Sequence, residues 1–218
     1  MMSDFKSENA MAQNRRLCLF DFDGTLTRSD SLLCLLSYCG GRGRLLWRLL
    51  LRSPQLVLMK LGLWSNHKLK QELFATYFQG MLLSDFDALC RRFARSHQHI
   101  LRSQGVDALR QALEQGADVA VVSASIDNWV RPFFWLALEG LEPEVLSRLR
   151  VLGTQVEVLG GRLTGRFATP NCYGQEKVRR IREAFPDVEG RPTVAYGDSR
   201  GDREMLRLAG ESHYKPFK

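Results

Sequence analysis

Two aspartates at the end of an apolar run are the residues of this chain whose types and spacing best suit chemistry. The run is Leu17–Phe20, and Asp21 and Asp23 follow it. Because side chains alternate between the two faces of a strand, both carboxylates are expected to project to the same side. Two like charges this close need a compensating cation, a shared proton or both.

The residues that follow the aspartates fit the same chemistry. Gly24 lets the backbone turn sharply, and Thr25 adds a hydroxyl group and an amide near the acids. Together these groups suit a hard metal ion and a substrate with an anionic oxygen. A solvated strand end that carries turn-forming acids is the alternative interpretation.

Polar residues also follow two later apolar runs. Ser123 and Ala124 end a valine-rich run, where a hydroxyl group and backbone N–H groups can bind a phosphate oxygen. Asp198 comes directly after the run Thr193–Gly197. Asp202 begins the next predicted helix, where a carboxylate suits the positive end of the helix dipole.

Lys177 is a candidate cation for the same site. It lies in the first turn of a predicted helix, on the side expected to lean inward. As a point charge, it can neutralise both a carboxylate and a phosphate. We interpret Arg179, Arg180 and Arg182, which follow it, as a solvated basic face.

The elements that position these residues alternate between strands and helices. Strands are predicted at residues 16–22, 118–122 and 193–196, and helices at about 106–115, 127–138 and 202–209. This alternation predicts an α/β fold with a Rossmann-like parallel sheet and crossover helices. In such sheets ligands bind at the carboxyl ends of the strands, where Asp21, Ser123 and Asp198 all fall.

Two segments depart from this alternation. Residues 152–167 contain Gly160 and Gly161 between short alternating runs, which predicts a β-hairpin appended to the core. Residues 30–105 are basic and rich in leucine at helical spacing, which predicts a helical insert over the strand ends. The predicted organisation is a flexible tail at 1–14, a catalytic core of 15–29 plus 106–218, and a cap at 30–105.

The composition indicates a cytoplasmic globular protein. The 218 residues are 44% hydrophobic, which allows one large α/β domain or a core with an insert. The 5 cysteines show no paired spacing, as expected of reduced thiols. Residues 1–14 are polar and lack the apolar segment of a signal peptide.

The net charge of +7 is concentrated in the predicted cap. Arg44, Arg48 and Arg52 recur every four residues, which aligns them on one helical face beside leucines. These charges exclude an ordinary membrane-spanning helix, but a basic amphipathic segment can lie on an anionic membrane surface. The alternative is that the leucines pack inside the cap and the arginines are solvated.

In this order and context, the four motifs resemble those of the haloacid dehalogenase superfamily of phosphatases. The first is Asp21–Thr25, the second Ser123, the third Lys177 and the fourth Gly197–Asp202. The insert after the first motif and the hairpin resemble the phosphoserine phosphatase-like subfamily IB, which implies a helical cap of the C1 type. The apolar, basic cap is most similar to members that include phosphatidylglycerophosphate phosphatases.

The resemblance implies a Mg²⁺-dependent phosphatase of phosphate monoesters. Asp21 would attack phosphorus to form an aspartyl-phosphate, and Asp23 would serve as general acid and base. The side chains of Asp21 and Asp198 and the main-chain carbonyl of Asp23 would hold the Mg²⁺. Asp202 would orient Lys177 or a metal-bound water. The phosphate would be bound by Gly24, Thr25, Ser123, Ala124 and Lys177.

The substrate is implied only as a class. A lipid-linked or other amphiphilic phosphate, such as a phospholipid headgroup, fits an apolar cap with Arg44, Arg48 and Arg52. Asp30 stands where phosphoserine phosphatases tend to have a glutamate that reads the substrate amine, which argues against phosphoserine. Phosphoserine or another small phosphorylated metabolite is the alternative.

Two classes without phosphatase activity are the remaining alternatives. A phospho-accepting receiver domain also combines aspartates, a hydroxyl group and a lysine, but it normally has adjacent acids and lacks an insert of this size. A non-catalytic anion-binding module would use the basic cap. The cap carries no recognisable nucleic-acid motif, so nucleic acid is not the expected partner.

Overall fold

The computed structural model describes residues 15–51 and 66–218, with side chains at all of these except 42, 44–51 and 66. Its centre is a parallel five-stranded sheet with the order β3-β2-β1-β6-β7. The strands are β1 (Leu17–Phe20), β2 (Asp118–Ile126), β3 (Leu149–Thr154), β6 (Thr193–Gly197) and β7 (Glu211–Tyr214). The predicted α/β fold is confirmed.

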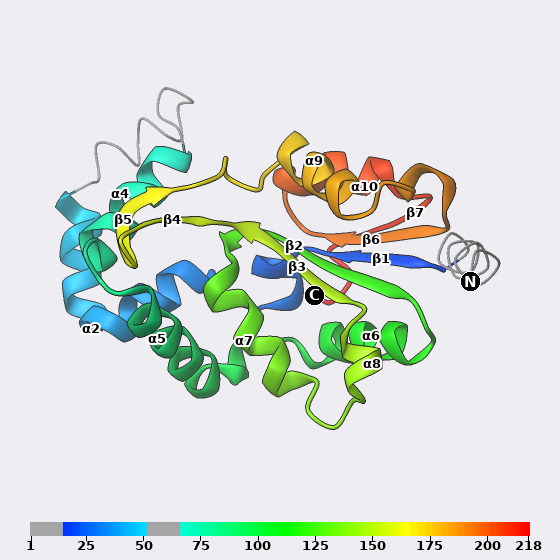
Figure 1. Cartoon of the computed structure of the whole chain (residues 1–218), viewed down its shortest axis with the longest axis horizontal. Helices are drawn as coiled ribbons and strands as arrows, with labels where there is room; N and C mark the ends of the chain where they lie inside the picture. The colour runs from blue at the N-terminus through cyan, green and yellow to red at the C-terminus, as the bar shows by residue number, and fades with distance from the viewer. Residues whose placement is uncertain (1–14, 52–65) are drawn as a thin grey trace.

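Helices cover both faces of this sheet (Figure 1). On one face lie α6 (Ser103–Glu114), α7 (Asp127–Ala137) and the short α8 (Pro143–Leu146), and on the other α9 (Gln175–Ala184) and α10 (Arg203–Leu208). The apolar run of β1 alternates between the two layers: Leu17 and Leu19 pack with α9 and α10, and Phe20 packs with the opposite layer. A strand buried on both faces is apolar at every position, as observed.

The predicted hairpin is present, but it begins later than expected. It consists of β4 (Val156–Leu159) and β5 (Arg162–Phe167), which pair antiparallel around Gly160 and Gly161. Leu152 belongs instead to β3, where it pairs with Val122 of the main sheet. Because β3 ends at Thr154 and β4 begins at Val156, a single residue separates the two strands, and the sequence pattern joined them.

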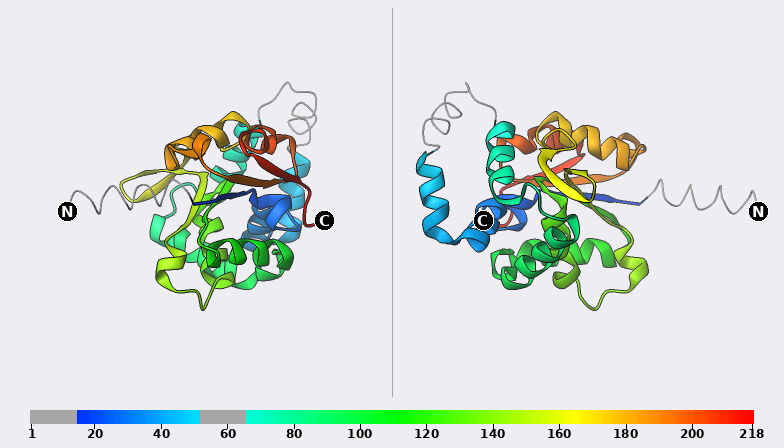
Figure 2. Two further views of the ribbon diagram at one scale, coloured as in Figure 1. Left: turned by 90° about the vertical axis from the view of Figure 1, so that its right-hand side faces the viewer. Right: turned by 60° about the vertical axis from the view of Figure 1, so that its left-hand side comes forward.

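The predicted insert is mainly helical in its described residues, with short non-helical links such as 79–82. It contains α2 (Ser31–Leu51), α4 (Asn66–Phe78) and α5 (Leu83–Ser96), which gather at one end of the molecule (Figure 2). The hairpin joins this end, because the Gly80 N–H donates to the Leu163 carbonyl at 2.8 Å. The centroids of the buried Phe93 and Phe133 rings are 5.6 Å apart. The helices of the insert therefore share one apolar cluster with α7, which covers one face of the sheet.

The predicted basic face of the insert is only partly covered by the structure. Arg44 and Arg48 lie on α2, but their side chains are outside the described set, and Arg52 is outside the described residues altogether. Within the described ranges, none of the helices is sufficiently long and apolar to cross a bilayer. The peripheral membrane contact therefore stays a prediction.

Candidate active site

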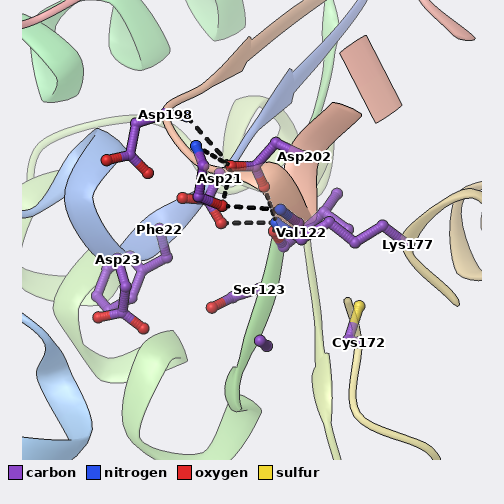
Figure 3. Close-up of polar contacts among 12 residues, drawn as sticks. Asp21, Phe22, Asp23, Val122, Ser123, Cys172, Lys177, Asp198 and Asp202 are labelled. Carbon is purple, nitrogen blue, oxygen red and sulfur yellow. Dashed lines mark hydrogen bonds and ion pairs between the residues drawn. The ribbon is translucent and has the colours of Figure 1, made fainter. Parts of the chain in front are cut away.

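A buried ion pair joins the first strand to the helix α9 (Figure 3). Asp21 follows β1 directly, and its side chain is almost fully buried. The ammonium group of Lys177, in the first turn of α9, lies 2.6 Å from Asp21 Oδ1. The parallel sheet brings these residues together although 156 positions separate them in sequence.

The Lys177 ammonium donates to three acceptors. Besides Asp21, these are Asp202 Oδ1 at 2.7 Å and the carbonyl of Val122 at 2.6 Å. All three N–H donors of the group therefore have a buried partner, which removes the penalty of burying an unpaired charge. Burial alone would lower the pKa of Lys177, but the two carboxylates outweigh it and raise this pKa above its usual value.

Asp202 contacts both Lys177 and the loop after β6. Its Oδ1 holds Lys177, and its Oδ2 accepts hydrogen bonds from the Ser199 N–H at 2.9 Å and the Ser199 hydroxyl at 2.8 Å. The same oxygen accepts from the Asp198 N–H at 3.1 Å. Burial would raise the pKa of Asp202, but Lys177 and the Ser199 donors hold it below its usual value. Asp202 thereby ties the loop after β6 to the lysine.

Three carboxylates form a cluster that fits a divalent cation. Oxygen atoms of Asp21, Asp198 and Asp202 all lie within 4.8 Å of one another. Carboxylate oxygens are the ligands that Mg²⁺ prefers. Because both oxygens of Asp202 already bind protein donors, Asp21 and Asp198 are the better candidates to contact a metal ion.

A second lysine lies on the outer side of this cluster. The Lys218 ammonium is 2.7 Å from Asp198 Oδ2, and its side chain is partly exposed.

Inside the cluster, burial raises the pKa of Asp21 to about 7, although Lys177 opposes the shift. An additional cation at the cluster would lower this pKa, so the charge balance of the site favours one.

The predicted phosphate-binding groups lie at the ends of β1 and β2. Ser123 is buried, its hydroxyl oxygen accepts a hydrogen bond from the Ser125 N–H at 3.0 Å, and Figure 3 shows it next to the acidic residues. The hydroxyl oxygen of Thr25 is buried without a partner in the part of the chain that the structure describes. Gly24 adopts a positive φ of 88°, which a side chain rarely tolerates.

Asp23 has partners of its own, separate from the Lys177 cluster. Its Oδ1 accepts from the Ser31 N–H at 2.7 Å, and its Oδ2 accepts from the Ser125 hydroxyl at 2.5 Å. Burial raises the pKa of Asp23, and the carboxylate of Asp30 adds to the shift. Burial is the larger of these two causes.

Asp30 does not point into the site. It is exposed, and its Oδ1 accepts a hydrogen bond from the Leu33 N–H at 3.0 Å. Asp30 thus caps the first turn of α2, which is a role that aspartate favours at helix starts.

The arginines of α9 divide differently from the prediction. Arg179 and Arg182 are exposed, but Arg180 is buried and donates to the Gly153 carbonyl at 2.8 Å. The interpretation of Arg180 as solvated was wrong. Positions three apart share a helix face, so Arg180 lies on the same inward side as Lys177, and helical spacing could have shown this.

Several residues with contacts to the acids were not identified from the sequence. Asp23 is held by Ser31 and Ser125, and Trp129 donates to the Ser31 hydroxyl oxygen at 3.0 Å. Lys218 contacts Asp198. The signal for Ser125 was its spacing from Ser123, since alternate residues of a strand share a face.

Comparison with known proteins gives consistent matches. Residues 18–207 match the model of the haloacid dehalogenase-like hydrolases. Protein CicA of Caulobacter vibrioides is 35% identical over 211 residues, covering 95% of this chain and 89% of CicA.

Solved structures with the same fold span nearly the whole chain. A protein of unknown function from Bordetella pertussis Tohama I has a TM-score of 0.73 at 22% identity and covers 91% of this chain and 89% of its own. An apo phosphoserine phosphatase has a TM-score of 0.57 at 20% identity, covering 92% of this chain and 86% of its own. At these sequence identities the structural similarity establishes the fold alone.

Proposed function

The chain belongs to the haloacid dehalogenase-like hydrolases, and we propose that it hydrolyses phosphate monoesters through an aspartyl-phosphate on Asp21. The observation that carries this proposal is the buried Lys177 ammonium, which Asp21 and Asp202 share beside a third carboxylate at the carboxyl edge of the sheet. A nucleophile next to a fixed cation suits the attack of a carboxylate on an anionic phosphate.

In the first step, a carboxylate oxygen of Asp21 attacks phosphorus. A bond forms between that oxygen and phosphorus, the ester P–O bond breaks, and Asp23 gives a proton to the leaving oxygen. In the second step, water attacks the same phosphorus while Asp23 accepts its proton. Inorganic phosphate leaves, and Asp21 is regenerated.

Mg²⁺ would be held by the side chains of Asp21 and Asp198 and by the main-chain carbonyl of Asp23. When bound, it offsets the repulsion between the nucleophile and a phosphate dianion. Ser123 and the amides of Gly24, Thr25 and Ala124 hold the phosphate oxygens, and the charge of Lys177 offsets that of the phosphate. That arrangement is supported by the buried Ser123 and by the unpartnered hydroxyl of Thr25.

We propose that the helical insert at 30–105 is a cap that selects the leaving group. Its basic, apolar sequence favours a lipid-linked or other amphiphilic phosphate, such as a phosphatidylglycerophosphate headgroup, met at a cytoplasmic membrane surface. The alternative is a small phosphorylated metabolite such as phosphoserine. The exposed Asp30, whose carboxylate caps α2, disfavours a role in reading a substrate amine.

The proposal is tested by a screen of lipid, amino-acid and sugar phosphates, together with p-nitrophenyl phosphate, with and without Mg²⁺. We expect metal-dependent phosphate release that is lost on chelation and in the Asp21→Asn variant. Absence of release from every ester with Mg²⁺, Mn²⁺ or Co²⁺ present would instead favour a non-catalytic anion-binding module.

A further inference from the structure

A one-way chain of hydrogen bonds runs from Trp129 to Asp23. The Trp129 indole Nε1–H donates to Ser31 Oγ at 3.0 Å. Ser31 Oγ lies 3.1 Å from Ser125 Oγ, which in turn lies 2.5 Å from Asp23 Oδ2. While Asp23 is ionised, chemistry sets the direction, because an indole N–H can only donate and an ionised carboxylate can only accept. Ser31 therefore donates to Ser125, and Ser125 donates to Asp23.

The three donors of this chain are shielded from water. Ser31 is 0% exposed, Trp129 2% and Ser125 3%. In such surroundings hydrogen bonds polarise one another, and water does not compete for the hydroxyl groups. With Asp23 ionised, only one arrangement of the two serine protons satisfies every hydrogen bond, and in it each hydroxyl proton points along the chain toward Asp23.

The start of α2 fixes the other oxygen of the same carboxylate. The Ser31 N–H donates to Asp23 Oδ1 at 2.7 Å, in the first turn of this 21-residue helix. The positive end of a helix dipole favours a carboxylate at this place. Both oxygens of Asp23 are therefore held, one by the helix start and one by the hydroxyl chain.

The hydrogen-bond chain also reaches the predicted phosphate site. The backbone N–H of Ser125 donates to Ser123 Oγ at 3.0 Å, while the Ser125 hydroxyl contacts Asp23. One residue of β2 therefore fixes the placement of the proposed acid relative to a proposed phosphate-binding hydroxyl. Apolar packing alone would not require this arrangement.

We propose that Trp129, Ser31 and Ser125 are positioning residues that orient the Asp23 carboxylate for proton transfer to the leaving oxygen. This inference rests on the proposed phosphatase function. It assigns to Trp129, in the helix after β2, a part in the reaction through two hydroxyl groups. A purely structural role is the competing explanation, and it predicts no dependence on the leaving group.

The kinetic test compares a reactive ester with an unreactive one. p-Nitrophenolate leaves with little protonation, whereas the alkoxide of glycerol phosphate needs an acid. With Mg²⁺ present, Ser125→Ala should slow single-turnover phosphorylation by glycerol phosphate by roughly tenfold or more, below the full 10²–10⁴-fold that acid–base catalysis supplies. Trp129→Phe should have a smaller effect in the same direction. Both variants should leave single-turnover phosphorylation by the nitrophenyl ester and the affinity for both esters nearly unchanged.

Two variants serve as controls. Ser125→Thr keeps the hydroxyl group and should restore most of the glycerol phosphate rate. Trp135→Phe makes the same replacement on the same helix, but Trp135 is exposed, so both esters should be hydrolysed at the wild-type rate. Equal losses for the two esters in Ser125→Ala and Trp129→Phe, or no loss, would overturn the positioning role.

A second arm tests the hydrogen-bond chain without relying on activity. In protein labelled with ¹⁵N-tryptophan, the Trp129 indole N–H resonance should shift in Ser125→Ala and Asp23→Asn, while that of Trp135 stays in place. A Trp129 resonance that ignores both substitutions in folded protein would contradict the chain. Inactivity of the wild type toward both esters would contradict the proposed function, and with it the role in proton transfer, but not the chain itself.

Discussion

Gly24 and Asp198 lie against each other between the ends of the first strand and β6. A methyl group on Gly24 would lie 2.5 Å from Asp198 Oδ2, which is closer than nonbonded atoms approach. Gly24 also has a φ of 88°. Because Gly24 has no side chain, the proposed metal ligand Asp198 can lie against the loop that follows the proposed nucleophile Asp21.

Gly24→Ala should consequently disturb the metal site as well as the backbone. We expect a higher Mg²⁺ concentration for half-maximal activity and a lower kcat, because Asp198 must move away. Gly140→Ala is the matched control, since Gly140 has a φ of 90° but no atom within 4 Å of the added methyl group. It should show only the strain of a left-handed residue, about 1–2 kcal/mol in unfolding experiments. Equal Mg²⁺ dependence in the two variants would count against the contact.

Lys177→Met should unfold the protein more easily as well as inactivate it. The substitution leaves Asp21 and Asp202 buried without their cation, and breaking such a buried pair typically destabilises by about 3–5 kcal/mol. Arg179→Met on the exposed face of α9 should leave the free energy of unfolding nearly unchanged. Denaturant titrations measure both. Wild-type stability of Lys177→Met would mean that the buried cation is dispensable for folding.

Lys218→Gln should make Mg²⁺ bind more tightly. The Lys218 ammonium lies 2.7 Å from Asp198 Oδ2 and would compete with a metal ion for that oxygen. Partly exposed ion pairs are worth about 0.2–1 kcal/mol. The half-saturating Mg²⁺ concentration should therefore fall by no more than about fivefold. Lys215→Gln, in the same segment, should leave it unchanged. A rise in Lys218→Gln would assign the lysine to substrate binding instead.

Asp23→Asn should impair alkyl esters more than aryl esters. The amide cannot donate a carboxylic proton to the leaving oxygen, and a nitrophenolate needs that proton least. Single-turnover phosphorylation with the two esters isolates the first step. Identical losses for both esters would remove Asp23 from the acid role.

The strand-end residues of the site were predictable because each signal is local. Asp21 and Asp198 each follow an apolar run, and parallel strands bring such ends to one edge of a sheet. Asp202 was recognised as a helix-start carboxylate with a second candidate role. In the structure Asp21 and Asp202 contact Lys177, and Asp198 lies beside these two carboxylates.

The surroundings of Asp23 were not predictable in the same way. Its hydrogen-bond partners are Ser31 at the start of α2 and Ser125 near the end of β2. Trp129 in α7 donates to Ser31, and a tryptophan in an apolar helix is typical of core packing. No local pattern distinguishes an indole that also donates a hydrogen bond from one that only packs. The edge strand β3 was missed for a different reason, because only one residue separates it from β4 and the sequence pattern joined the two into one segment.

The central claim is that Asp21 carries the phosphoryl group. Acid quenching of the wild-type protein during turnover of a phosphate ester with Mg²⁺, followed by peptide mass spectrometry, tests it directly. We predict a phosphoryl adduct on the peptide that contains Asp21, cleaved by hydroxylamine as an acyl phosphate is and absent from Asp21→Asn. Turnover without this adduct on rapid quenching, an adduct on another residue, or full activity of folded Asp21→Asn would contradict the account.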